Sequence, residues 1–182
     1  YGDSLEAAVD INFLAAWEAY RDFDLEPVVI AILDTGVAGG HPDLENQLVG
    51  WHDAVGVEET YEDGNGHGTS VASIAAASTN NNEGIAGTAW NADIYAIRVL
   101  DCECQGSAVG LANGLDVARQ QDVNVISMSL IGYTNTDELQ SAVQNAYNAN
   151  IPLISAAGNR LHVDQSSAVQ YPGRYDQTLA VG

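Results

Sequence analysis

The chain has 182 residues, enough for one domain with a sizeable core, and its 46 % apolar content is ordinary for a globular protein. Its 25 acidic residues face only 5 basic ones, all arginine, and the net charge of −20 argues against binding to nucleic acid or to an anionic membrane. No stretch is apolar for long enough to span a membrane, and the N-terminus lacks the basic and apolar regions of a signal peptide.

Apolar runs and helical patterns alternate along the chain. A short helix is predicted near Trp17, followed by a buried strand at 28–33, where every residue is apolar. The alanine-rich stretch 68–78 predicts a helix after a glycine-rich turn, and the apolar run 94–100 predicts the next strand. The pattern continues with helix 107–121, strand 123–128, helix 136–149, strand 152–156 and the start of a strand at 178–182. This alternation, without repeats or a linker, predicts one domain built on a parallel α/β sheet.

The acidic composition and the two cysteines bear on the environment of the protein. A strong negative charge suits a secreted protein, a calcium binder or a protein that stays soluble in high salt, and we expect a secreted protein in a saline setting. Cys102 and Cys104 lie in the segment "CEC", either as two surface thiols or as a small strained disulfide ring. The local sequence lacks the further ligands that a metal site would need.

Three polar residues follow predicted strands or begin predicted helices, where parallel α/β sheets carry their functional groups. Asp34 directly follows the apolar run "VVIAIL", either as a rigid carboxylate that orients a partner or as the cap of a turn before Gly36. His67 lies between two glycines at the start of a predicted helix, whose positive end favours the neutral imidazole of a general base. Asn159 follows "ISAAG" and is either an oxyanion donor or a turn residue.

Taken together, these segments resemble the subtilisin-like serine proteases, the subtilases, from about residue 28 to residue 182. "AILDTGV" resembles the segment around the family's catalytic Asp, and "DGNGHGTSVASIAA" resembles the segment around its catalytic His. The segments "GIAG", "IYAIRVL", "VNVISMSL", "ISAAGN" and "QYPGRYDQTLAVG" follow in the family's order. The resemblance implies a three-layer, doubly wound, mostly parallel sheet with helices on both faces. It also implies a serine endopeptidase in which Asp34 orients His67, His67 moves the proton of a serine, and Asn159 holds the oxyanion.

The resemblance further implies two backbone edges beside the scissile bond, to which an extended peptide adds by main-chain hydrogen bonds. These edges comprise Ser129, Leu130, Ile131 and Gly132 on one side, and Ala156, Ala157 and Gly158 on the other. Ile131 stands where many members have Gly, Gln170 occupies a pocket position that is small in many members, and Arg160 lies near the pocket rim. These three residues predict a shortened, partly polar pocket for an acidic or medium-sized side chain.

A structural calcium ion is also implied by the resemblance. Asp43, in "HPDL", matches an acidic ligand of many relatives, and the loop "STNNNEGI" at 78–85 matches a loop that supplies carbonyl and amide oxygens. Either Asn80 or Asn81 would supply the amide, with Ile85 as a further ligand. The alternative is an acid beside an Asn-rich turn that binds no ion.

The family's nucleophile lies in a Gly-Thr-Ser segment after the oxyanion Asn, and no such segment occurs in residues 1–182. We therefore interpret the chain as a peptidase catalytic domain that stops before its nucleophile, is inactive alone, and has a peptide or protein substrate and an N-terminal propeptide as partners. The serines that lack the required setting are Ser70, Ser129, Ser155, Ser166 and Ser167.

Three other classes of protein remain as alternatives. The first is a non-catalytic binding or decoy domain that keeps the fold. The second is a phosphate-binding glycine loop at "GNGHG", which lacks a lysine and a directly preceding strand. The third is a metal-dependent hydrolase, with ligands drawn from Asp34, His41, Asp43, His52, Asp53 and His67.

Overall fold

The computed structural model describes residues 12–20, 23, 26–56, 61–159 and 169–182. Within these residues the helices are α1 (Phe13–Tyr20), α2 (His67–Ala76), α3 (Ala108–Gln120) and α4 (Asp137–Asn148). The strands are β1 (Val28–Asp34), β2 (Leu48–Asp53), β3 (Ala92–Arg98), β4 (Val125–Met128), β5 (Leu153–Ala156) and β6 (Leu179–Val181).

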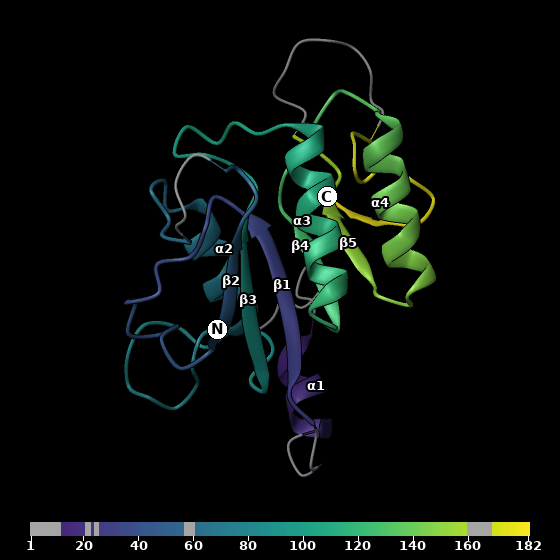
Figure 1. The fold of residues 1–182 in the computed structure, drawn as a ribbon. Coiled ribbons are helices and arrows are strands. Elements are labelled where there is room, and N and C mark those ends of the chain that lie inside the picture. The colour runs from purple at the N-terminus through teal and green to yellow at the C-terminus, as the bar shows by residue number, and fades with distance from the viewer. Residues whose placement is uncertain (1–11, 21–22, 24–25, 57–60, 160–168) are drawn as a thin grey trace.

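The six strands form one sheet in the order β2-β3-β1-β4-β5-β6, and every pair of neighbours is parallel (Figure 1). The chain fills the sheet on one side of β1 with β2 and β3, and then crosses to the other side with β4, β5 and β6. The strand order therefore switches between β1 and β4, and in doubly wound sheets ligands bind beyond the carboxyl ends of the strands at such a switch. Asp34 is the last residue of β1 and lies at this position.

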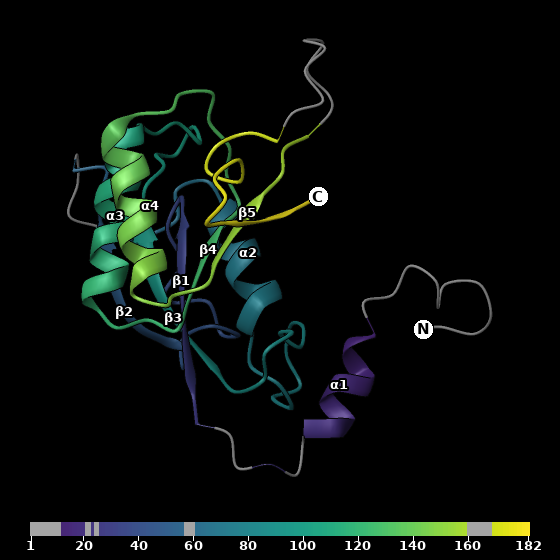
Figure 2. The same cartoon turned by 90° about the vertical axis from the view of Figure 1, so that its right-hand side faces the viewer.

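Helices cover both faces of the sheet, as the resemblance implied. Figure 2 shows α3 and α4 on one side of the strands and α2 on the other. One buried cluster joins Ala72 and Ala76 of α2 to Ile32 of β1. A second cluster, on the opposite face, joins Leu33 of β1 to the inner residues of α3 and α4, among them Leu115 and Val143. Because successive residues of a strand point to opposite faces, residues 28–33 of β1 are all apolar and serve both clusters.

The predicted elements are present with ends that differ by a few residues, but the sequence prediction missed β2. This strand reads "LVGWHD", which contains a glycine and ends in two polar residues. It is an edge strand that pairs only with β3, its register shifts between Leu48 and Gly50, and Val49 and Trp51 are exposed. Since only one side of β2 is paired, it does not need the continuous apolar run that marks a central strand.

No helix in the described ranges is long and apolar enough to cross a membrane.

Candidate active site

Asp34 and His67 form a hydrogen-bonded pair at the carboxyl end of β1. The Asp34 carboxylate is fully buried, and its Oδ1 lies 2.7 Å from His67 Nδ1. The same oxygen accepts a hydrogen bond of 2.7 Å from the backbone N–H of Thr35. A carboxylate only accepts, so Nδ1 carries the proton and Nε2 of the neutral ring is left to accept another. The His67 side chain is 45 % exposed, so the pair combines a buried acceptor with an accessible base.

The second carboxylate oxygen of Asp34, Oδ2, is buried and has no hydrogen-bond partner. A buried carboxylate with an unsatisfied oxygen is poorly solvated, and a positive charge nearby stabilises it more than it would in water. Protonation of His67 places such a charge next to Asp34. A protonated His67 would therefore face the buried Asp34 carboxylate directly.

His67 reaches Asp34 because α2 packs against β1 with almost no space between the two backbones. His67 is the first residue of α2, and Gly68 follows it. A Cβ on Gly68 would overlap the carbonyl oxygen of Gly36 and would lie 3.1 Å from Asp34 Cβ. Glycine at position 68 is thus required for this close approach.

Asp63 holds the start of α2 against the turn after β1, a role that the sequence analysis missed. Its Oδ1 accepts hydrogen bonds from the Thr35 hydroxyl at 2.8 Å and from the backbone N–H groups of Asn65 and Gly66 at 3.0 and 2.8 Å. Its Oδ2 accepts from the backbone N–H and the hydroxyl of Thr69 at 2.8 and 2.7 Å. The available signal was an Asp followed by Gly-Asn-Gly just before a helix, which is typical of an Asx turn and helix cap.

Burial and these hydrogen bonds together set the pKa of the Asp63 carboxyl. Burial by itself raises the pKa of the Asp63 carboxyl, but the hydrogen bonds from Thr69, Gly66 and Thr35 outweigh burial and lower the pKa below its ordinary value. The charged form is therefore the one that the fold stabilises. Because Thr35 is the neighbour of Asp34 and Thr69 lies in the first turn of α2, Asp63 fixes the two segments that carry the Asp34–His67 pair.

These contacts also bear on the phosphate-loop alternative. The backbone N–H groups at the start of α2 are already used: His67 donates to Asn65 Oδ1, Gly68 to the Thr35 hydroxyl and Thr69 to Asp63. An anion at this helix start would have to displace these partners and approach the Asp63 carboxylate. The geometry disfavours a phosphate-binding loop.

The predicted peptide-binding edges follow β4 and β5 at the same end of the sheet. Gly132 donates its N–H to the Tyr171 carbonyl at 2.7 Å and accepts from the Tyr171 N–H at 3.2 Å. Gln170 donates its backbone N–H to the Ala157 carbonyl at 3.3 Å. The segment around residue 170 therefore links the stretch 129–132, with Ser129, Leu130 and Ile131, to the stretch 156–158, with Ala156, Ala157 and Gly158.

Ile131 and Gln170 both approach Gly158. A Cβ built on Gly158 would lie 3.7 Å from Gln170 Cγ and 3.9 Å from Ile131 Cγ2. The side-chain oxygen of Gln170 is buried and has no hydrogen-bond partner. Asn159 directly follows Gly158 and is exposed to solvent. Arg160 lies outside the described residues.

The predicted calcium residues are only partly brought together. Asp43 is buried, its Oδ1 accepts from the Asn81 amide at 2.6 Å, and its Oδ2 accepts from the Ile85 backbone N–H at 2.8 Å. The hydrogen bond from Asn81, together with that from Ile85, lowers the pKa of Asp43. A Cβ on Gly84 would overlap the same carboxylate, so the loop closes tightly around it. Asn80 is exposed, and Asn81 is the one of the two that contacts Asp43.

The metal-hydrolase alternative has no assembled ligand set in the part of the chain that the structure covers, where no three His, Cys, Asp or Glu side chains could hold an ion together. His52 and Asp53 lie in β2, and Asp53 pairs with the buried Arg98 at 3.4 Å. His41 Nδ1 accepts from the backbone N–H of Asp43 at 3.2 Å.

The fold and this site define an α/β protein with an Asp–His pair suited to proton transfer at the switch point of its sheet. The model of the subtilase family matches residues 26–182, so the chain belongs to the subtilase family of serine proteases. Thermitase of Thermoactinomyces vulgaris is 47 % identical over 152 residues, which cover 84 % of this chain and 53 % of thermitase. Subtilisin DY of Bacillus licheniformis is 39 % identical, over 85 % of this chain and 56 % of its own length.

The major intracellular serine protease of Bacillus subtilis is also similar, at 40 % identity over 85 % of this chain and 50 % of that protease. The chain thus spans about half the length of the curated relatives it matches. These relatives thus include an intracellular protease as well as a subtilisin.

Proposed function

We propose that the chain supplies the acid–base part of a serine endopeptidase that cleaves peptide bonds with an Asp-His-Ser triad. The hydrogen bond of 2.7 Å between Asp34 Oδ1 and His67 Nδ1 carries this proposal, because it leaves Nε2 free to take the proton of a hydroxyl nucleophile. The serine is proposed to come from a segment outside residues 1–182. Family membership supports the assignment of the reaction type.

In this proposal each residue has one task. His67 removes the serine proton and later gives it to the leaving amine, while Asp34 holds the imidazole and stabilises its charged form. The Asn159 side chain donates a hydrogen bond to the oxyanion. The substrate lies extended along residues 129–132 and 156–158 and pairs with them as an added strand.

The proposed pocket for the side chain before the scissile bond is shortened by Ile131 and made partly polar by Gln170. Contact of both side chains with the position of Gly158 supports this placement. Large aromatic side chains are disfavoured, and medium-sized or acidic ones are accepted.

The proposed activity is tested with the protein expressed from its full reading frame. Wild-type protein is treated with a serine-directed phosphonate and assayed on tetrapeptide anilides. We expect labelling of a serine outside residues 1–182 and loss of both labelling and hydrolysis in His67→Ala. His52→Ala is the matched control and keeps both. Hydrolysis that survives in His67→Ala and stops with a chelator would favour a metal hydrolase. A folded protein without hydrolysis or labelling would favour the non-catalytic binding domain.

A structural calcium ion is proposed separately, at Asp43 with oxygens from Asn81 and the loop around Ile85. The Asp43 carboxylate is a hard oxygen donor of the kind that suits Ca²⁺, and because Asn81 and Ile85 now donate N–H groups to it, their oxygens would have to turn towards the ion. When bound, the ion would tie the loop 78–85 to the segment that carries Asp43. We expect calcium to raise the melting temperature by several degrees, an effect that a chelator reverses and Asp43→Asn abolishes. Asp176→Asn is the control, and a melting temperature that does not change when calcium is added would contradict the proposed calcium site.

The proposed setting is extracellular and saline, and a propeptide is proposed as a partner in folding. The net charge of −20 supports the first point, because a strongly acidic surface stays hydrated and soluble when salt screens its self-repulsion. Solubility and activity measured against sodium chloride concentration test it. Highest activity at low salt would contradict the saline setting.

A further inference from the structure

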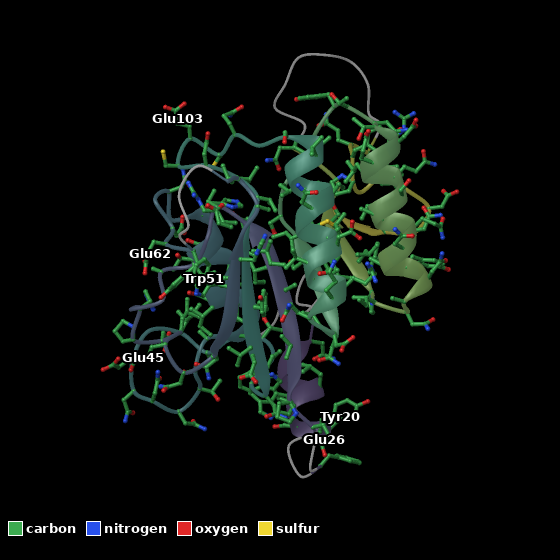
Figure 3. All side chains as sticks on the ribbon, viewed as in Figure 1. Tyr20, Glu26, Glu45, Trp51, Glu62 and Glu103 are labelled. Carbon is green, nitrogen blue, oxygen red and sulfur yellow. The ribbon has the colours of Figure 1, made fainter. Side chains whose placement is uncertain are left out.

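The loop Asp101–Gln105, between β3 and α3, carries both cysteines of the chain. Cys102 and Cys104 are exposed free thiols. The loop is a compact turn: Asp101 donates its N–H to the Gln105 carbonyl at 2.8 Å, and Cys104 donates its N–H to the Asp101 carbonyl at 3.1 Å. Asp101 Oδ1 also accepts from the N–H groups of Glu103 and Gln105, both at 2.9 Å. Figure 3 shows Glu103 at the tip of this loop, projecting into solvent.

The turn brings the two cysteines close enough for a bond. Two successive trans peptide units span at most about 7.6 Å between Cα atoms, and a turn shortens that distance. Disulfides join Cα atoms about 4.4–6.8 Å apart. Cys104 has a φ of 58°, in the left-handed region that side-chain-bearing residues seldom adopt, and its N–H closes a turn onto the Asp101 carbonyl.

This loop contacts the segment that positions His67. The Asn65 side-chain amide donates to the Cys102 carbonyl at 2.9 Å, while Asn65 Oδ1 accepts from the His67 backbone N–H at 3.3 Å. A Cβ on Gly64 would lie 3.1 Å from Cys102 Cβ. Asn65 therefore bridges the cysteine loop to the first residue of α2, because its side chain binds both the Cys102 carbonyl and the His67 N–H.

We propose that Cys102 and Cys104 form a thiol–disulfide site that reacts with small disulfides of the glutathione type, and that closing the disulfide perturbs His67 through Asn65. The thiol chemistry is independent of peptidase activity, whereas its effect on turnover rests on the function proposed above. A disulfide ring of only three residues is conformationally restricted. Its closure therefore moves the turn and weakens the hydrogen bond from the Asn65 amide to the Cys102 carbonyl. Similar relatives include intracellular proteases and subtilisins, and the redox state of this pair follows the compartment.

The reaction consists of two exchanges. The Cys102 thiolate attacks one sulfur of the small disulfide, whose S–S bond breaks and releases one small thiolate. The Cys104 thiolate then attacks the Cys102 sulfur of the mixed disulfide and expels the second thiolate. The protein loses two electrons and two protons, and the small disulfide takes them up as two thiols. Burial and the carboxylates of Asp34, Asp63 and Asp101 raise the pKa of Cys104, which lowers its thiolate fraction and suits it to the second, intramolecular attack.

The test uses the protein from its full reading frame, equilibrated in reduced or oxidised glutathione. Peptide mapping by mass spectrometry should find an intramolecular Cys102–Cys104 disulfide in the oxidised sample. Nuclear magnetic resonance should show shifts of the Asn65 side-chain amide and the His67 ring on oxidation. Cys102→Ser and Cys104→Ser should abolish both changes, and Glu103→Gln, within the same loop, should keep them.

Two results would overturn the proposal. One is a pair that stays reduced, or stops at a mixed disulfide with glutathione, under oxidising conditions. The other is a disulfide that forms without any shift at His67. Both results are measured without an activity assay, so an absence of peptidase activity does not affect the test of the thiol chemistry. Where the protein hydrolyses peptides, we expect oxidation to lower kcat/KM by about five-fold or more, which is the lower end of the usual coupling between two sites. The kcat/KM of Cys102→Ser and of Cys104→Ser should not change on oxidation.

Discussion

The two halves of the site differ in the groups that hold them in place. Around Asp34 and His67, five hydrogen bonds to Asp63 and a backbone approach that only glycine allows fix the geometry. Along residues 129–132 and 156–159, the contacts are backbone hydrogen bonds to neighbouring segments, among them Tyr171 and Gln170, while Asn159 is exposed and the Gln170 oxygen has no partner. The acid–base half is thus fixed by side-chain hydrogen bonds, while the half proposed to bind the peptide is held by a few backbone hydrogen bonds.

The largest effect on the acid–base half is expected when the charge of Asp34 is removed. Asp34→Asn keeps the shape but favours the wrong tautomer of His67, and kcat should fall by about 10⁴-fold with little change in KM. Peptide hydrolysis by the protein from its full reading frame measures this effect. Asp116→Asn, on the exposed side of α3, is the control. A fall below ten-fold would remove Asp34 from the mechanism.

Asn159→Ala tests the exposed half. Loss of one oxyanion donor should lower kcat by about 10²–10³-fold, the magnitude measured for subtilisin itself, and should leave KM nearly unchanged. Asn113→Ala in α3 serves as the control. An effect confined to KM would instead make Asn159 a ground-state contact.

Gln170→Gly sharpens the assignment of the pocket. Removing the side chain that meets Ile131 over Gly158 enlarges the pocket, and the preference for a large aromatic over a medium-sized side chain should rise by about 10–100-fold in kcat/KM. Peptide libraries measured with both proteins provide the comparison, and Gln140→Gly in α4 controls for folding. If the wild-type protein already prefers large aromatic side chains, the short polar pocket is wrong.

The smallest effect is expected from Asp63→Ala, which loosens the start of α2 without touching substrate. Loss of the cap should destabilise the fold by about 1–2 kcal/mol, with a smaller loss for Asp63→Asn, and should lower kcat more than it raises KM. Urea unfolding and steady-state kinetics measure the two effects. Equal stability of wild type and Asp63→Ala would contradict the role of this carboxylate.

The pH dependence of this effect has a definite sign. The pKa of Asp63 is lowered in the folded protein, so its stabilisation is fully present above the ordinary Asp value near 3.9 and is lost as the pH falls through the lower folded value. The stability difference between wild type and Asp63→Ala should therefore be constant near neutral pH and shrink below about pH 4. A difference that grows on acidification would contradict this assignment.

Much of the fold was predictable because central strands and packed helices have strong sequence patterns. The run "VVIAIL" is apolar on both faces since both faces of β1 are covered, and that pattern located the strand ending at Asp34. Strand β2 was missed because an edge strand with exposed Val49 and Trp51 obeys no such constraint. Local pattern therefore predicts buried elements better than edges.

The site was predictable where its residues follow regular elements and unpredictable where distant segments meet. Asp34 and His67 were assigned from ordered motifs, and their pairing at 2.7 Å agrees with that expectation. The role of Asp63 depends on Thr35, which is 28 positions away, and no local pattern encodes that contact. Likewise, Asn81 rather than Asn80 contacts Asp43, in a turn where Asn80 and Asn82 both have positive φ, and the repeated asparagines conceal this detail.

The Asp63 hydrogen bonds also have a consequence for local opening of the molecule. The backbone amides of Gly66 and Thr69 share one acceptor side chain, and the hydroxyl of Thr69 in turn accepts from the Ala38 N–H at 3.0 Å. Exchange of the Gly66 or Thr69 amide proton with solvent requires its hydrogen bond to the Asp63 carboxylate to break. The turn after β1 and the first turn of α2 should therefore open together, as one cooperative unit, with matching exchange rates.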